Sequence, residues 1–153
     1  MELFNLSKQY NFYKAYHKNK INVLIHVFCI PIIMWTISVS LTHFSTNIFY
    51  NPTFYLTNIY SAYYLILDKE LGKIMTMVFY FSWITSYHFY WYISNSIYYA
   101  TILHILSWIA QFGGHFYFEG NRPALTDSLL QAFLVAPIFV LIDIKHLFKN
   151  NTH

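Results

Sequence analysis

Histidines gather in two polar clusters of a chain that is otherwise largely apolar. One cluster, residues 16–26, contains His17 and His26, and the other, residues 108–125, contains His115. Ionisable groups at the edge of long uncharged segments are costly to bury, so they indicate a functional site. Neutral imidazole is a ligand for Fe, Zn, Cu and Ni, so three or four convergent histidines predict a transition-metal site.

The second cluster has helical periodicity. Spacings of four, three, four and four residues place one set of side chains on a single helix face: His104, Trp108, Gln111, His115 and Glu119. His115 and Glu119, four apart, can contact the same ion or share a hydrogen bond. His104 and His115 lie eleven residues apart, which is roughly 16 Å along a straight helix. A straight helix therefore cannot give both imidazoles to one metal.

Three arrangements would accommodate His104. Gly113–Gly114 breaks or bends the helix, or there are two sites, or His104 supports a ligand without being one. Two adjacent glycines in a helix cost roughly 1 kcal/mol each relative to alanine, so they need a structural reason. We expect a bent or broken helix at the glycine pair.

The first cluster requires a turn of the chain. His17 and His26 are nine residues apart and would lie on opposite sides of a continuous helix. They converge only if the chain turns between them, and residues 18–22 have the polarity for such a turn. Asn22 could then orient one imidazole, because metal-bound histidines commonly hydrogen-bond through their other nitrogen.

Composition places these clusters in a membrane protein. Of the 153 residues, 57% are hydrophobic and 10% are charged, whereas about a quarter are charged in a soluble domain. No Asp, Glu, Lys or Arg occurs in residues 21–67, 74–118 or 128–142. A membrane-spanning helix needs roughly 20 mostly apolar residues, so each of the first two runs holds two spans. We expect one membrane-embedded domain, residues 1–153.

The expected fold is an all-α integral membrane bundle. An interfacial helix covers about the first sixteen residues, with Tyr10, Tyr13 and His17 on its buried face. Four spans follow, at residues 21–42, 53–67, 74–93 and 97–118. A short fifth element after Asp127 is interrupted by Pro137, which could make it a re-entrant hairpin.

The charge distribution predicts the orientation. Four lysines precede the first uncharged run against Glu2 alone, which places the N-terminus in the cytoplasm. Both polar clusters then lie at the cytoplasmic rim, in one pocket formed by His17, Asn22, His26, His115, Glu119 and Arg122. The basic residues are few and flank membrane segments, so we expect a lipid bilayer as partner and no nucleic acid.

The two clusters carry motifs of a known family. The first motif comprises Tyr16, His17, Asn22, Ile25, His26 and Pro31. The second comprises Trp108, Gln111, Phe112, Gly114, His115, Phe118, Glu119, Pro123, Ala124 and Leu125, and Ala136-Pro137 follows it. Together they resemble the membrane 2-hydroxy fatty acid dioxygenases of phytosphingosine degradation. Gly113 and Phe116 depart from that pattern.

The resemblance implies a 2-oxoglutarate-independent, non-haem Fe(II) dioxygenase that shortens a long-chain 2-hydroxy fatty acid by one carbon with O2. It implies iron ligands at His17, His26, His104 and His115. Further site candidates are Glu119, Gln111 and Asn22 for catalysis and Arg122 for the substrate carboxylate. The expected location is the endoplasmic reticulum membrane in a eukaryote and the inner membrane in a bacterium.

Other readings of the histidines compete with this one. Diiron hydroxylases and desaturases need boxes such as HxxHH, and the chain has no adjacent histidine pair. A b-type haem protein would use two histidines as axial ligands, and a scaffold would use none. A lone histidine in a span is more often a hydrogen-bonded packing residue, which we expect of His43 and His88.

Overall fold

The structure, a computed structural model, describes residues 4–123 and 129–149. The described residues form six α-helices, one 3-10 helix and one π-helix and contain no strand, which confirms the all-α class. Residues 1–31 and 108–153 belong to one compact unit and residues 32–107 to a second. A single domain stays a prediction.

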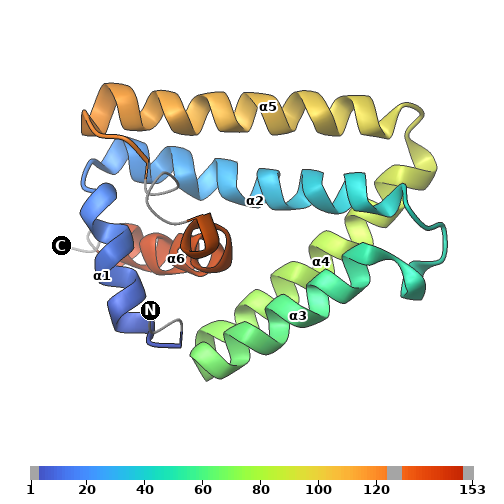
Figure 1. Ribbon diagram of the computed structural model, residues 1–153, viewed down its shortest axis with the longest axis horizontal. Helices are drawn as coiled ribbons and strands as arrows, with labels where there is room; N and C mark the ends of the chain where they lie inside the picture. Colours follow the sequence, from blue (N-terminus) through green and yellow to red (C-terminus); the bar gives the residue numbers. More distant parts are fainter. Residues whose placement is uncertain (1–3, 124–128, 150–153) are drawn as a thin grey trace. The chain divides into compact units, whose positions relative to one another are not determined.

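The first unit contains α1 (Leu6–Tyr16), the start of α2 (Lys20–Thr42), the end of α5 (Ser96–Gly114), the π-helix η2 (His115–Glu119) and α6 (Leu129–Lys149). Helix α1 begins where the Asn5 side chain accepts a hydrogen bond from the Lys8 amide at 3.1 Å. Helices α1 and α6 pack together (Figure 1). Tyr10 and Tyr13 contact the Phe139 ring, at centroid distances of 5.5 and 4.7 Å.

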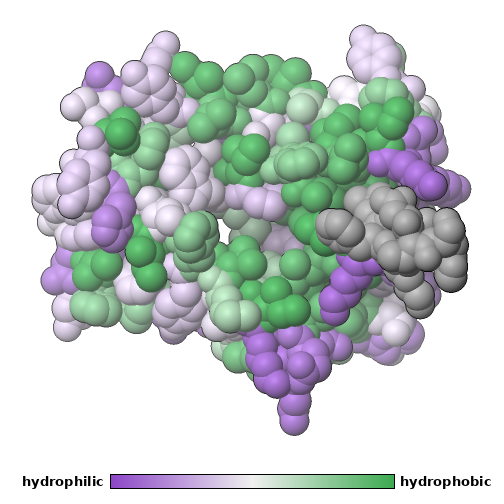
Figure 2. Space-filling model, turned by 180° about the vertical axis from the view of Figure 1, so that it is seen from behind, coloured by the Kyte–Doolittle hydropathy of each residue, from purple (hydrophilic) through white to green (hydrophobic). Residues whose placement is uncertain are grey.

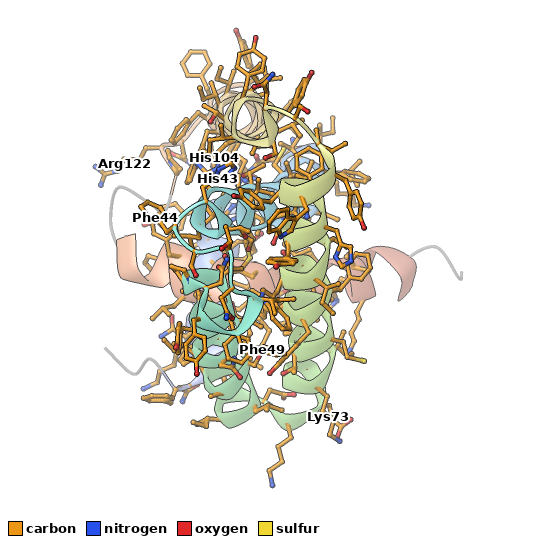
Figure 3. All side chains as sticks on the ribbon, turned by 90° about the vertical axis from the view of Figure 1, so that its right-hand side faces the viewer. His43, Phe44, Phe49, Lys73, His104 and Arg122 are labelled. Atoms are coloured by element: carbon orange, nitrogen blue, oxygen red, sulfur yellow. The ribbon has the colours of Figure 1, made fainter. Side chains whose placement is uncertain are left out.

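The second unit contains η1 (Ile48–Tyr50) and a hairpin of α3 (Pro52–Leu67) and α4 (Lys69–Tyr92). Asp68 is the single residue between the two helices. Its N–H donates a hydrogen bond to the Tyr64 carbonyl oxygen, and its side chain accepts one from the Leu71 amide. A Cβ at Gly72 would lie 2.5 Å from the Tyr64 carbonyl oxygen, so glycine permits this close approach. Lys73 extends from the hairpin end (Figure 3) and pairs with Glu70 at 2.8 Å.

The helices match some expected spans closely, whereas α4 begins at Lys69, five residues before the third expected span, and ends at Tyr92. Helices α2 and α3 each begin one residue before the expected span and end at the expected residue, and the fourth span continues from α5 into η2. The expected interruption at Pro137 is wrong, because α6 continues through this residue over 21 residues. Asp127, after which this element was expected to begin, lies outside the described residues, as do Ala124 and Leu125 of the second motif.

One helix has the properties expected of a membrane span. Among the helices that the structure describes, α2 has the required length and composition. Core helices of soluble proteins share these properties, so the integral membrane bundle stays a prediction. Large apolar side chains are also exposed over wide areas (Figure 2), among them Phe28, Ile66, Phe81 and Ile109, each at least 61% exposed.

Candidate metal centre

Three histidines meet in the first unit. The candidate ligand atoms of His17, His26 and His115 all lie within 4.8 Å of one another. The side chains are only 7%, 4% and 2% exposed, respectively. Their rings meet edge to face, with centroid distances of 4.5, 4.8 and 4.9 Å. We call these three residues the histidine triad.

A turn between α1 and α2 brings the first two histidines together. Helix α1 ends at Tyr16, His17 is its C-cap, and α2 begins at Lys20. The Asn19 side chain accepts a hydrogen bond from the Ile21 amide at 2.9 Å and so begins α2. The expected turn between His17 and His26 is therefore present.

Backbone carbonyls fix the orientation of both rings. The Nδ1 atom of His17 lies 2.9 Å from the Tyr13 carbonyl oxygen, and that of His26 lies 2.9 Å from the Asn22 carbonyl oxygen. A carbonyl only accepts, so each Nδ1 carries the proton and each neutral ring keeps its lone pair on Nε2. Metal-binding histidines are commonly held in this way.

Buried nitrogen atoms without hydrogen-bond partners make the triad suitable for a metal ion. Within the described residues, the buried Nε2 of His17 and Nδ1 of His115 have no hydrogen-bond partner. Such atoms are rare in proteins because leaving them unpaired costs free energy. Burial lowers the pKa of His17 to about 4, against the opposing effect of the Tyr13 carbonyl. The imidazole is thus neutral at neutral pH, the form that binds a transition metal.

Glu119 holds the turn between the triad's first two members. One oxygen, Oε1, accepts hydrogen bonds from the backbone amides of Lys18 and Asn19, both at 2.9 Å. The same oxygen accepts from Asn22 Nδ2 at 3.0 Å. Glu119 lies at the end of η2, the π-turn that begins with His115. The carboxylate therefore ties the segment that carries His115 to the segment that carries His17 and His26.

The glycine pair does not break helix α5. The helix remains α-helical through Gly113 and Gly114, and the geometry changes only at His115, where the π-turn starts. A Cβ at Gly114 would lie 2.5 Å from Asn22 Oδ1, whereas a Cβ at Gly113 would have no neighbour within 4 Å. The expected break is wrong, whereas the alternative of a bend stays a prediction. Gly114 lets α2 approach α5 closely.

His104 lies in the second unit and is not one of the triad residues. Its Nδ1 is 2.9 Å from the hydroxyl oxygen of Thr36, which itself donates to the Ile33 carbonyl. The unbroken helix between His104 and Gly114 rises by roughly 1.5 Å per residue. This favours the arrangements in which His104 belongs to another site or supports a ligand. Its role as an iron ligand stays a prediction.

Two buried amides accompany the triad in the first unit. Gln111 is 7% exposed and Asn22 is fully buried. Gln111 Nε2 and Asn22 Oδ1 lack hydrogen-bond partners among the residues that the structure describes. One is an unused donor and the other an unused acceptor. Arg122 is exposed, and its side chain extends away from the ribbon (Figure 3).

Asp143 is a residue of this region that the sequence analysis did not identify. Its Oδ2 accepts a hydrogen bond from the Tyr13 hydroxyl at 3.0 Å, and the Tyr13 ring stacks on His17. Asp143 is the acidic residue that ends the third uncharged run, at residues 128–142. An acidic residue at the edge of an uncharged run marks this position as costly to bury, but it does not identify Tyr13 as the partner.

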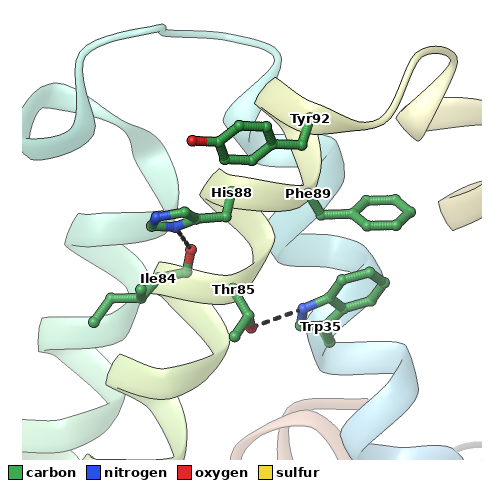
Figure 4. Close-up of a pocket in the computed structure, with 6 residues that line it drawn as sticks. All are labelled: Trp35, Ile84, Thr85, His88, Phe89 and Tyr92. Carbon is green, nitrogen blue, oxygen red and sulfur yellow. Dashed lines mark hydrogen bonds between the residues drawn. The ribbon is translucent and has the colours of Figure 1, made fainter.

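The second unit contains an apolar groove of about 480 Å³ (Figure 4), lined by Trp35, Ile84, Thr85, His88, Phe89 and Tyr92. The Nδ1 of His88 donates to the Ile84 carbonyl at 2.8 Å. The Nε2 of His43 hydrogen-bonds Ser96 Oγ at 3.2 Å. Both histidines are hydrogen-bonded within their own unit, as expected, but His88 is exposed rather than packed.

Fold and site together define a class: an all-helical protein with a buried three-histidine centre suited to a transition metal. Residues 3–147 match the family described as "Mpo1-like: 2-hydroxy-palmitic acid dioxygenase Mpo1-like". The chain belongs to this family, which confirms the resemblance found in the two motifs.

A characterised relative is the 2-hydroxy-palmitic acid dioxygenase MPO1 of Saccharomyces cerevisiae. It is 31% identical over 141 residues, which cover 92% of this chain and 80% of the relative. No solved structure matches the chain.

Proposed function

We propose that this protein is an Fe(II)-dependent dioxygenase that removes C1 from a long-chain 2-hydroxy fatty acid with O2. The observation that carries the proposal is the histidine triad in a chain of this family, in which the buried Nε2 of His17 and Nδ1 of His115 lack hydrogen-bond partners among the described residues. The yeast relative is named for 2-hydroxy-palmitic acid, so this acid is the first substrate to test.

The proposed reaction balances without a further reductant. A 2-hydroxy acid and O2 give an acid one carbon shorter, carbon dioxide and water. Oxidation of C2 to a carboxyl group and of C1 to carbon dioxide releases four electrons, which is the number that O2 takes up. When bound, Fe(II) would supply the redox chemistry with O2. The substrate supplies the electrons, so 2-oxoglutarate is not needed.

The polar side chains of the first unit have complementary roles in this proposal. Three neutral imidazoles leave the positive charge of a bound Fe(II) intact, which favours an anionic substrate. The unused Gln111 Nε2–H can donate to the substrate carboxylate or hydroxyl, and the unused Asn22 Oδ1 can accept from the hydroxyl. Arg122 is a further candidate for the carboxylate.

We also propose that the chain is embedded in a membrane through α2, α3, α4 and α5, with the triad at the cytoplasmic side. The uncharged runs and the exposed apolar side chains support this location. In a eukaryotic cell the membrane would be the endoplasmic reticulum, and in a bacterium the inner membrane. An apolar acyl tail would then remain among apolar helices while the carboxylate reaches the triad.

Oxygen uptake by the purified, iron-loaded protein tests the proposal. With 2-hydroxy-palmitic acid and no 2-oxoglutarate, we expect O2 consumption and an acid one carbon shorter, identified by mass spectrometry. Palmitic acid, which lacks the hydroxyl, is the matched control and should give neither. An absolute requirement for 2-oxoglutarate would contradict the electron balance. A Soret band in the purified protein would indicate the haem alternative instead.

A further inference from the structure

Asp143 is a buried acid that the proposed reaction does not use. It belongs to α6, is 8% exposed, and accepts the Tyr13 hydroxyl hydrogen bond at 3.0 Å. Tyr13 belongs to α1, and the two residues are 130 positions apart in the sequence. Burying a carboxylate costs free energy unless it is hydrogen-bonded, so an apolar residue would pack this position more favourably. The hydrogen bond therefore suggests a purpose other than packing.

Tyr13 holds His17 at two points. Its ring stacks on the His17 imidazole, with a centroid distance of 3.9 Å and an interplanar angle of 13°. Its carbonyl oxygen accepts from His17 Nδ1 at 2.9 Å. The ring contact sets the plane of the imidazole and the carbonyl sets its tautomer. Both determine where Nε2, the free nitrogen, points.

The Tyr13 hydroxyl is anchored by the acid rather than by solvent. Tyr13 is 6% exposed, and its hydroxyl donates to Asp143 Oδ2 at 3.0 Å. A hydrogen bond at the tip of the ring restricts its rotation, and the ring restricts His17.

We propose that Asp143 and Tyr13 are positioning residues that hold the imidazole of His17 in the orientation needed to bind the metal of the histidine triad. This inference rests on the proposed metal centre. Partners that orient a metal-ligating histidine typically change metal affinity 10–100-fold when they are removed. Asp143 acts through Tyr13, so its effect should lie near the lower end of that range.

The test measures metal binding by the full-length protein, with Co(II) as a spectroscopic probe and Fe(II) as a competitor. Asp143→Leu leaves the Tyr13 hydroxyl unpaired, and we expect about tenfold weaker binding with a changed Co(II) absorption spectrum. Asp143→Asn keeps an acceptor oxygen and should retain the wild-type spectrum and affinity within about twofold. Lys145→Ala, an exposed position on the same helix, is the matched control.

A double-mutant cycle separates positioning from a general loss of structure. Tyr13→Phe keeps the ring and removes the donor, so in that background Asp143→Leu no longer leaves a hydroxyl unpaired. The losses of affinity should then be less than additive. Circular dichroism identifies any variant that fails to fold, and Asp143→Asn and Tyr13→Phe test the proposal even if Asp143→Leu does.

Two results would overturn the inference: wild-type affinity and spectrum in Asp143→Leu, or equal damage by Asp143→Asn and Asp143→Leu. Failure of the proposed function looks different. In that case the wild-type protein itself binds no metal, or binds it and consumes no O2 with the hydroxy acid.

Discussion

At the scale of single residues, metal binding depends on the three histidines acting together. Each imidazole is one of three nitrogen donors, so removal of two leaves too few ligands to hold a transition metal. We expect one Fe(II) per wild-type chain and none when any two of His17, His26 and His115 become alanine. Elemental analysis of protein purified without added metal measures this.

The matched control for the triad is His88→Ala. His88 is exposed, lies in the second unit and donates its Nδ1 proton to its own helix, so iron content should be unchanged. Wild-type iron content in a double variant of the triad would show that the metal is elsewhere.

His104 gives a second prediction at this scale. Eleven residues of helix rise by roughly 16 Å, and α5 is unbroken from Ser96 through Gly114. We therefore expect His104→Ala to retain the iron while turnover falls. Iron content and oxygen uptake measured on the same preparation distinguish the two effects. Loss of iron in His104→Ala would restore this residue as a ligand, as the family resemblance implies.

The residues of the triad were predictable, and their anchors were not. His17, His26 and His115 each have polar neighbours in an apolar chain, so their cost of burial reveals them in the sequence. Asp143 and Tyr13 meet across 130 positions, and only the packing of α6 on α1 makes them partners. Two residues so far apart in the sequence form no periodic pattern that could reveal them as partners.

At the scale of elements, Glu119 links two segments through one atom. Glu119→Ala would leave two backbone amides and the Asn22 amide without their acceptor. Of these donors Asn22 is the buried one, and an unsatisfied buried group costs about 1–3 kcal/mol. The α1–α2 turn should therefore loosen and the metal should bind more weakly. Glu119→Gln retains Oε1 and is the matched control. Equal metal affinity in Glu119→Ala and Glu119→Gln would contradict this role.

The glycine pair tests the close approach of α5 to Asn22 on α2. Gly114→Ala places a Cβ 2.5 Å from Asn22 Oδ1, and Asn22 cannot swing aside easily because Glu119 holds its Nδ2. We expect α5 and α2 to separate and iron affinity to fall. Gly113→Ala has open space and should raise helix stability by up to about 1 kcal/mol. Metal titration and thermal unfolding of both variants measure the difference, and equal behaviour would contradict the close-approach argument.

The charge pattern predicted the positions of several helices, whereas the expected helix breaks were wrong. Helices α2, α3 and α5 lie almost entirely within uncharged runs, whereas α4 begins at Lys69 and α6 extends past Asp143. Pro137 and Gly113–Gly114 were expected to interrupt helices, but α6 continues through Pro137 and α5 continues through both glycines. Local propensity is a weak prior that tertiary contacts override.

At the scale of the whole molecule, lysine placement predicts which side each connection occupies. With the N-terminus in the cytoplasm and α2 to α5 each crossing once, Lys8 and the α3–α4 connection near Lys73 face the cytoplasm. The connections near Phe44 and Ser94 then face the opposite side. The lysines near Lys73 agree with this arrangement, because positive charge is enriched on the cytoplasmic side.

Cysteine labelling in sealed membrane vesicles tests this topology. Cys29 is the one cysteine of the chain, so Cys29→Ala provides a background for Lys8→Cys, Lys73→Cys, Phe44→Cys and Ser94→Cys. A membrane-impermeant maleimide added from the cytoplasmic side should label the two lysine positions and leave the other two unlabelled until the vesicles are opened. Phe44, which Figure 3 labels, is 79% exposed, so it is accessible once the reagent reaches its side. Labelling of Lys8→Cys and Phe44→Cys from the same side of intact vesicles would show that α2 does not cross the membrane.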